Sequence, residues 1–142
     1  MNEKALKTLE YSKIIQMLEN FATSSCGKDL CRSLIPLDNL NEIEIMQQET
    51  ADALARIYQK GSLSFGGVKD IRSSLKRLEI GSTLGTGELL SLCSLLENTN
   101  RAKAYARREN AEEKQDSLDS MFEILQPLTP LALEIRRCIL SE

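Results

Sequence analysis

Histidine and tryptophan are absent from this 142-residue sequence, and aromatic residues make up only 4% of it. Without histidine there can be no Ser-His-Asp or Cys-His catalytic site, no histidine-ligated metal and no HExxH zinc helix. With so few aromatic rings, the hydrophobic core has to be built from aliphatic side chains. These absences exclude most common hydrolase and metalloenzyme sites.

Long apolar runs are also missing. None approaches the roughly 18 residues that a membrane-spanning helix needs, and the residues after Met1 form no positive leader followed by an apolar stretch. The four cysteines have neither the spacing of a zinc site nor that of a CxxC redox motif; they are Cys26, Cys31, Cys93 and Cys138. We therefore expect a cytoplasmic chain with reduced thiols and no membrane contact.

The overall composition is that of a folded, mildly acidic domain. Apolar residues make up 42% and charged residues 27%, and the formal net charge is −3. A chain of this length and composition favours one globular domain. The small negative charge gives no global attraction toward nucleic acid, so any such binding has to be local.

Apolar residues recur at helical spacing along almost the whole chain. Tyr11, Ile14, Ile15 and Leu18, for example, follow the i, i+3, i+4, i+7 pattern of one helix face. Caps and breakers divide the pattern into segments. The predicted helices are 11–22, a second from Ser24 or Ser25 to near Ile35, a third from Asn39 or Asn41 to Gly61, a fourth from Val68 to Gly81, a long fifth from Thr86 to about Arg108, a short sixth after Asp116 or Ser117 up to Pro127, and a seventh from Thr129 onward.

The fold class predicted from this pattern is all-α, with six to seven helices of which one is long. Only Ser62 to Phe65 alternates polar and apolar residues, so at most one very short strand pair is expected. We divide the chain into a helical segment 1–108, a polar linker or solvated helix end 109–117, and two further helices in 118–142.

The seventh helix carries Leu131, Ile135 and Ile139 and is still apolar where the sequence stops, without a glycine or proline stop signal. We therefore expect a truncated chain whose last helix exposes an apolar face.

One charge cluster is a candidate nucleic-acid contact. It lies on the second half of the long helix, carries four positive charges around one tyrosine, and consists of Arg101, Lys103, Tyr105, Arg107 and Arg108. Such a cluster can neutralise a few phosphates. Because Glu109 follows at once and the chain is acidic, an ordinary solvated helix face remains the alternative.

No residue qualifies for catalysis, cofactor binding or metal binding. Gly81, Gly85 and Gly87 precede a helix but lack the G-x-x-x-x-G-K-[ST] pattern of a phosphate loop. Acidic pairs such as Glu42 with Glu44 fall in segments that we expect to be exposed, which favours solvated surface over acid–base or Mg²⁺ chemistry.

Several short strings resemble a known family in their order along the chain. They are Thr8-Leu9-Glu10-Tyr11, Gly27-Lys28-Asp29-Leu30, Glu49-Thr50 with Ala53, Phe65-Gly66-Gly67-Val68-Lys69-Asp70-Ile71-Arg72, and Leu84 to Leu89. Over residues 6 to about 96 the sequence resembles the amino-terminal segment of the second-type MutS paralogues of bacteria. The family pattern leads us to expect proline where Ser64 stands.

The resemblance implies a much longer parent protein with core and lever helices, a clamp, a homodimeric ATPase module that uses ATP and Mg²⁺, and a carboxy-terminal Smr endonuclease domain. It implies that the parent binds branched DNA and stalled ribosomes through DNA and rRNA contacts, suppresses homologous recombination and rescues collided ribosomes. The present segment would be non-catalytic helical scaffold without a cofactor of its own. The alternative is a stand-alone helical adaptor that binds a partner helix.

Overall fold

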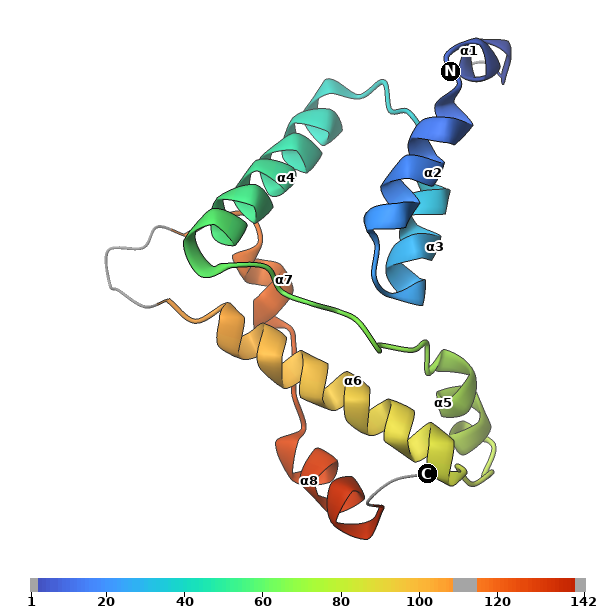
Figure 1. Ribbon diagram of the computed structural model, residues 1–142, viewed down its shortest axis with the longest axis vertical. Helices are drawn as coiled ribbons and strands as arrows, with labels where there is room; N and C mark the ends of the chain where they lie inside the picture. Colours follow the sequence, from blue (N-terminus) through green and yellow to red (C-terminus); the bar gives the residue numbers. More distant parts are fainter. Residues whose placement is uncertain (1–2, 109–114, 140–142) are drawn as a thin grey trace. The chain divides into compact units, whose positions relative to one another are not determined.

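The computed structural model describes residues 3–108 and 115–139 (Figure 1). All regular structure in these two ranges is α-helical and none is strand, which confirms the all-α fold class. The described residues form eight helices: α1 (Glu3–Thr8), α2 (Tyr11–Phe21), α3 (Ser25–Ser33), α4 (Leu40–Lys60), α5 (Arg72–Glu79), α6 (Thr86–Tyr105), α7 (Asp119–Glu123) and α8 (Thr129–Cys138). The sequence pattern missed α1, because six residues are too few to show a periodic stripe.

The chain divides into two compact units. The first comprises Met1–Ser64 and Asp116–Leu118, and the second comprises Phe65–Gln115 and Asp119–Glu142. These boundaries differ from the composition-based segments 1–108, 109–117 and 118–142, which remain a prediction. Most of the predicted linker, residues 109–114, lies outside the described residues. No helix in the described ranges combines the length and apolarity needed to cross a bilayer.

In the first unit α2 and α3 pack against each other (Figure 1). Ser24 caps α3, its hydroxyl accepting a hydrogen bond from the Gly27 N–H at 3.1 Å. The Tyr11 hydroxyl on α2 donates to the Leu34 carbonyl just beyond α3, at 3.2 Å. Helix α3 ends at Ser33, two residues before the expected limit, because Leu34 already has the extended backbone that leads toward Pro36.

Helix α4 runs for 21 residues between the two predicted signals. The Asn39 side chain accepts from the Asn41 N–H at 3.1 Å and so caps the first turn. Gly61 ends the helix with φ of 79°, a left-handed value that glycine adopts without a steric penalty. The alternating stretch that follows, Ser62 to Phe65, is irregular chain rather than strand.

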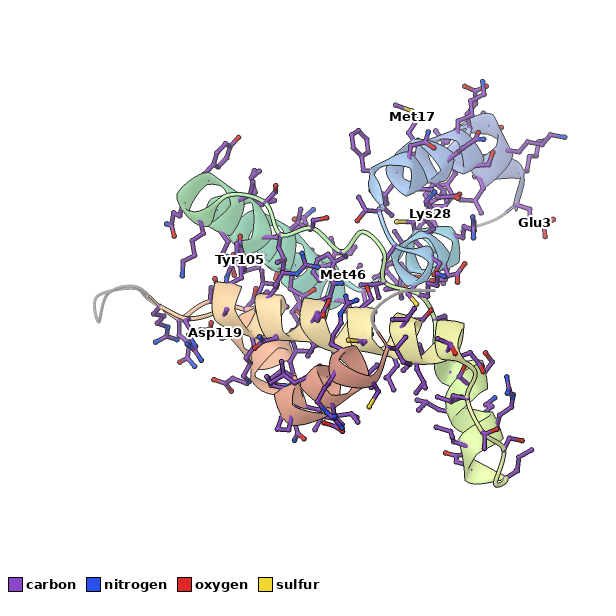
Figure 2. All side chains as sticks on the ribbon, turned by 60° about the horizontal axis from the view of Figure 1, so that its bottom comes forward. Glu3, Met17, Lys28, Met46, Tyr105 and Asp119 are labelled. Atoms are coloured by element: carbon purple, nitrogen blue, oxygen red, sulfur yellow. The ribbon has the colours of Figure 1, made fainter. Side chains whose placement is uncertain are left out.

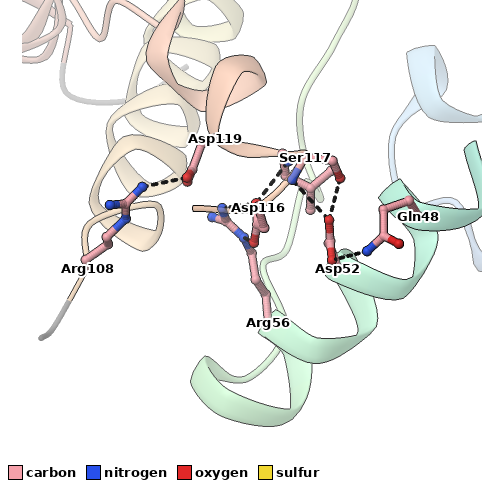
Figure 3. A network of polar contacts seen from close by, with 8 residues as sticks. Gln48, Asp52, Arg56, Arg108, Asp116, Ser117 and Asp119 are labelled. Carbon is pink, nitrogen blue, oxygen red and sulfur yellow. Dashed lines mark hydrogen bonds and ion pairs between the residues drawn. The ribbon is translucent and has the colours of Figure 1, made fainter. Parts of the chain in front are cut away.

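Three residues distant in sequence complete the first unit. We call Asp116, Ser117 and Leu118 the latch, and its first two residues are hydrogen-bonded to side chains of α4 (Figure 3). The Arg56 guanidinium donates to both carboxylate oxygens of Asp116, at 2.6 and 2.5 Å. The Asp52 carboxylate accepts from the Ser117 hydroxyl at 2.6 Å and from the Ser117 N–H at 3.0 Å.

The second unit contains the aliphatic core, where α8 packs along α6. Cys93 and Leu96 of α6 and Ala132 and Ile135 of α8 are buried, and Ile139 packs against them. The expectation that Ile135 and Ile139 lack a partner is therefore wrong, because α6 supplies one. Leu131 does stay 45% exposed, and α8 ends at Cys138 rather than continuing.

Two other helices of this unit are shorter than the sequence pattern predicts. Helix α5 begins at Arg72 instead of Val68, because the Asp70 side chain accepts from the Arg72 N–H and fixes the first turn there. Helix α6 ends at Tyr105, three residues before Arg108, and the Ala106 N–H just beyond it donates to the Ala102 carbonyl. Periodicity identifies such helices better than it locates their ends.

Candidate nucleic-acid interface

The predicted basic cluster lies where the carboxy-terminal half of α6 meets α7 in the second unit. A hollow of about 390 Å³ opens there. Its charged lining comprises three cations and two acids: Lys103, Arg107, Arg108, Asp119 and Glu123. The structure thus gathers the cluster around a concave surface, but it also brings acids from α7 that lie outside the cluster in sequence.

Lys103 is hydrogen-bonded to the carboxy-terminal end of α7. Its half-buried ammonium group donates to the Phe122 carbonyl at 3.0 Å and to the Glu123 carbonyl at 2.7 Å. The last carbonyl groups of a helix have no partner within the helix and carry partial negative charge, so a cation there satisfies and stabilises them. Lys103 therefore caps α7.

Arg108 and Tyr105 also face α7. The Arg108 guanidinium donates to the Asp119 carboxylate at 2.7 Å (Figure 3), and Asp119 is only 9% exposed. The Tyr105 and Phe122 rings lie 6.2 Å apart, centre to centre, with their planes tilted by 46°. This offset geometry is favourable for an aromatic pair.

The other two members are exposed on α6 and just after it. The Arg101 guanidinium donates to the Asn98 side-chain oxygen at 2.8 Å, one turn back along α6. Arg107 lines the hollow. Lys103, Tyr105 and Arg108 thus hold α7 in place, and nucleic-acid contact by the cluster stays a prediction. No sequence pattern indicates the α7 role, because the partners of these side chains lie 11 to 20 residues away.

The glycine-rich turn before α6 is organised around its own carboxylate. Glu88 accepts from the Gly85 N–H at 3.0 Å, from the Ser74 hydroxyl at 2.7 Å and from the Arg77 guanidinium at 2.8 Å. The Gly85 and Ser74 hydrogen bonds lower the pKa of Glu88, so the group is an anion at neutral pH. A negative charge at this helix start disfavours an anion such as phosphate.

The cysteines and acids of the described residues form no metal centre, since no group of three or more His, Cys, Asp or Glu side chains gathers there. Cys93 is fully buried, and its thiol lies 3.5 Å from the Ala132 carbonyl and 3.6 Å from the Glu97 carboxylate. Burial, reinforced by the Glu97 charge, raises the pKa of this thiol. A buried, protonated thiol is a packing group and not a nucleophile.

Among known proteins, no family model matches this chain. Three relatives, each named endonuclease MutS2, align with the entire chain: those of Lachnoclostridium phytofermentans at 54% identity, Agathobacter rectalis at 50% and Lachnospira eligens at 39%. The chain spans only about 17–18% of the length of these relatives.

The all-helical fold and these matches define the chain as part of a MutS-type protein. More narrowly, it belongs to the MutS2 endonuclease family, of which it represents one segment. The resemblance found in the sequence is therefore confirmed.

Proposed function

We propose that this chain is the amino-terminal helical scaffold of a full-length MutS2-type protein and performs no chemistry itself. The observation that carries the proposal is the whole-chain similarity, at 54% identity, to a relative of which the chain covers 18%. A segment so similar to a fraction of a much longer protein has its function within that protein.

The character of the first unit supports a scaffold role. Among its described residues the only buried side chain is Arg56, whereas Met17 is 64% exposed, Phe21 82% and Leu30 70%. Folded domains gain their stability by burying such side chains. Apolar side chains that remain this exposed suit a segment that packs against further parts of the same protein.

For the full-length protein we propose the activities implied by the family resemblance. These are ATP- and Mg²⁺-dependent work by a homodimer, nuclease action through a separate domain, and binding of branched DNA and stalled ribosomes in the cytoplasm, leading to suppression of recombination and rescue of collided ribosomes. The relatives' name, endonuclease MutS2, supports the nuclease part. None of these activities is assigned to a residue of this chain.

The experiment compares the full-length protein, the protein lacking this segment, and the truncated protein with the segment supplied as a separate chain. We expect truncation to abolish the ATPase activity or the soluble assembly of the protein. The separately added segment should bind the truncated protein and partly restore the lost property. The segment alone should show no ATP binding by calorimetry at micromolar concentrations. Full activity after truncation, together with no association of the added segment, would support the stand-alone adaptor instead.

A further inference from the structure

The most continuous apolar surface of the first unit runs along α4. Five residues at i, i+3, i+7, i+11 and i+14 share one face and form what we call the α4 stripe: Ile43, Met46, Thr50, Leu54 and Ile57. Met46 is 43% exposed, Leu54 49% and Ile57 46%. At 1.5 Å per residue the stripe is about 21 Å long. This length matches a helix–helix contact and exceeds that of an isolated exposed apolar residue.

A hollow deepens the amino-terminal end of this stripe. It measures about 360 Å³ and is lined by Ile43, Met46 and Thr50 of the stripe, by Gln47, and by Ile35 and Leu37 of the preceding chain. Ile35 is 71% exposed. Stripe and hollow together form an apolar groove of the kind into which the side chains of a second helix can pack.

The opposite face of α4 is already occupied. Asp52, which lies opposite the stripe by helical geometry, binds Ser117 of the latch, and Arg56, one turn further along α4, binds Asp116 (Figure 3). Figure 2 shows the side chains of α4, with Met46 labelled on the helix. The latch thus fixes one face of α4 and leaves the apolar face for a partner.

Charge around the stripe identifies the chemistry of that partner. The first sixteen residues of α4 contain four acids and no lysine or arginine: Glu42, Glu44, Glu49 and Asp52. Helical geometry places Glu42 and Glu49 along one edge of the stripe; Arg56 continues this line, but its charge is paired with Asp116. A partner helix with lysine or arginine at its edge complements these two acids.

Resting on the function proposed above, we infer that the α4 stripe docks an amphipathic helix with an aliphatic face and a cationic edge, from a part of the same full-length protein outside this chain. The relatives' length leaves more than four-fifths of such a protein to supply it. A symmetric pairing of two α4 stripes is the poorer occupant, because it brings the same acidic edge of both copies together.

The experiment measures thiol labelling at the stripe in the isolated chain and in the full-length protein. Leu54→Cys reports on the stripe, and Gln59→Cys, an exposed position outside the stripe near the end of α4, is the matched control. Peptide mass spectrometry separates both from the native cysteines. We expect Leu54→Cys to label at least about tenfold more slowly in the full-length protein, a closing preference of about 1.4 kcal/mol, while Gln59→Cys changes little.

Equal labelling of Leu54→Cys in both proteins overturns the inference, even when the segment associates with the truncated protein and the proposed function therefore stands. If the isolated chain labels slowly at position 54 and dilution restores fast labelling, a second copy occupies the stripe. This result also overturns the inference. In the full-length protein, Glu42→Lys with Glu49→Lys should restore fast labelling at position 54, whereas Glu3→Lys should not. Unchanged protection after the double reversal contradicts the cationic edge.

Discussion

Arg56 carries a permanent charge into a position where its side chain is only 10% exposed. Such a charge is tolerated because Asp116 meets it through two hydrogen bonds and is itself 23% exposed. Arg72 and Asp70 form a similar two-pronged pair, but at 73% and 38% exposure. The two pairs have the same chemistry but differ in burial. Comparing their contributions to stability therefore separates the effect of burial from that of ion pairing.

We expect Arg56→Ala to destabilise the first unit by about 2–3 kcal/mol, because it removes both guanidinium hydrogen bonds from the Asp116 carboxylate in a poorly hydrated place. Arg72→Ala should cost less than about 1 kcal/mol, as exposed pairs do. Urea denaturation followed by circular dichroism measures both. Equal losses would mean that the latch is no more important than a surface ion pair.

Asp70 gives a second prediction at this scale. Hydrogen bonds from Arg72 lower the pKa of this carboxyl to about 2, against an ordinary 3.8. Because the folded-state pKa is lowered, the Asp70 contribution to stability is fully present above about pH 3.8 and is lost as the pH falls through about 2. NMR titration of the carboxyl carbon should find the low value, and Arg72→Ala should return it toward 3.8 while Arg77→Ala leaves it low.

Among the elements, α7 depends most on its neighbours. A five-residue helix is far too short to be stable alone, and it is held by Lys103 at its carboxy-terminal end and by the Arg108–Asp119 pair at its start. Two of the candidate cations, Lys103 and Arg108, therefore act on backbone and carboxylate groups of α7, and phosphate contact by the cluster stays a prediction.

Lys103→Met keeps the apolar stem but removes the charge that caps α7. We expect amide hydrogen exchange in residues 120–123 to become about 5–30-fold faster, corresponding to a loss of one or two kcal/mol. Arg101→Met, which removes a cation from the same helix without touching α7, should leave that exchange unchanged. A similar rise in both variants would show that the effect comes from net charge.

The nucleic-acid hypothesis is tested by charge removal. Changing Arg101, Lys103, Arg107 and Arg108 to alanine should weaken binding to branched DNA and structured RNA and flatten its salt dependence, from a starting affinity no tighter than about 10⁻⁴ to 10⁻⁶ M. The matched control changes four lysines of the first unit to alanine: Lys4, Lys7, Lys13 and Lys28. If both quadruple variants bind alike, or the cluster variant binds as tightly as the original, the cluster is only a solvated face.

Local signals determine which elements were predictable. Ser24, Asn39 and Gly61 act within four residues of their own position, so the ends that they define follow directly from the sequence. The latch and the α7 contacts join residues that are 11 to 65 positions apart, and no periodic pattern encodes such pairs. The candidate cluster is recognisable in the sequence as four cations around one tyrosine, but the residues that its members contact are known only from the structure.

At the scale of the whole molecule the two units differ in kind. The second has its own core, in which Cys93 and Leu96 pack against Ala132 and Ile135. The first has capped helices and a polar latch, yet Arg56 is the only buried side chain in its described part. This contrast is the physical basis for regarding the chain as scaffold that the remainder of a longer protein completes.

The most direct test of this account compares amide hydrogen exchange of the 142-residue chain alone with that of the same residues in the full-length protein. We predict that exchange in α2, α3 and α4 slows by at least about 100-fold, or 2.8 kcal/mol of added protection, while the α6 and α8 core changes far less. Identical exchange of α2 to α4 in the two proteins would contradict the scaffold account.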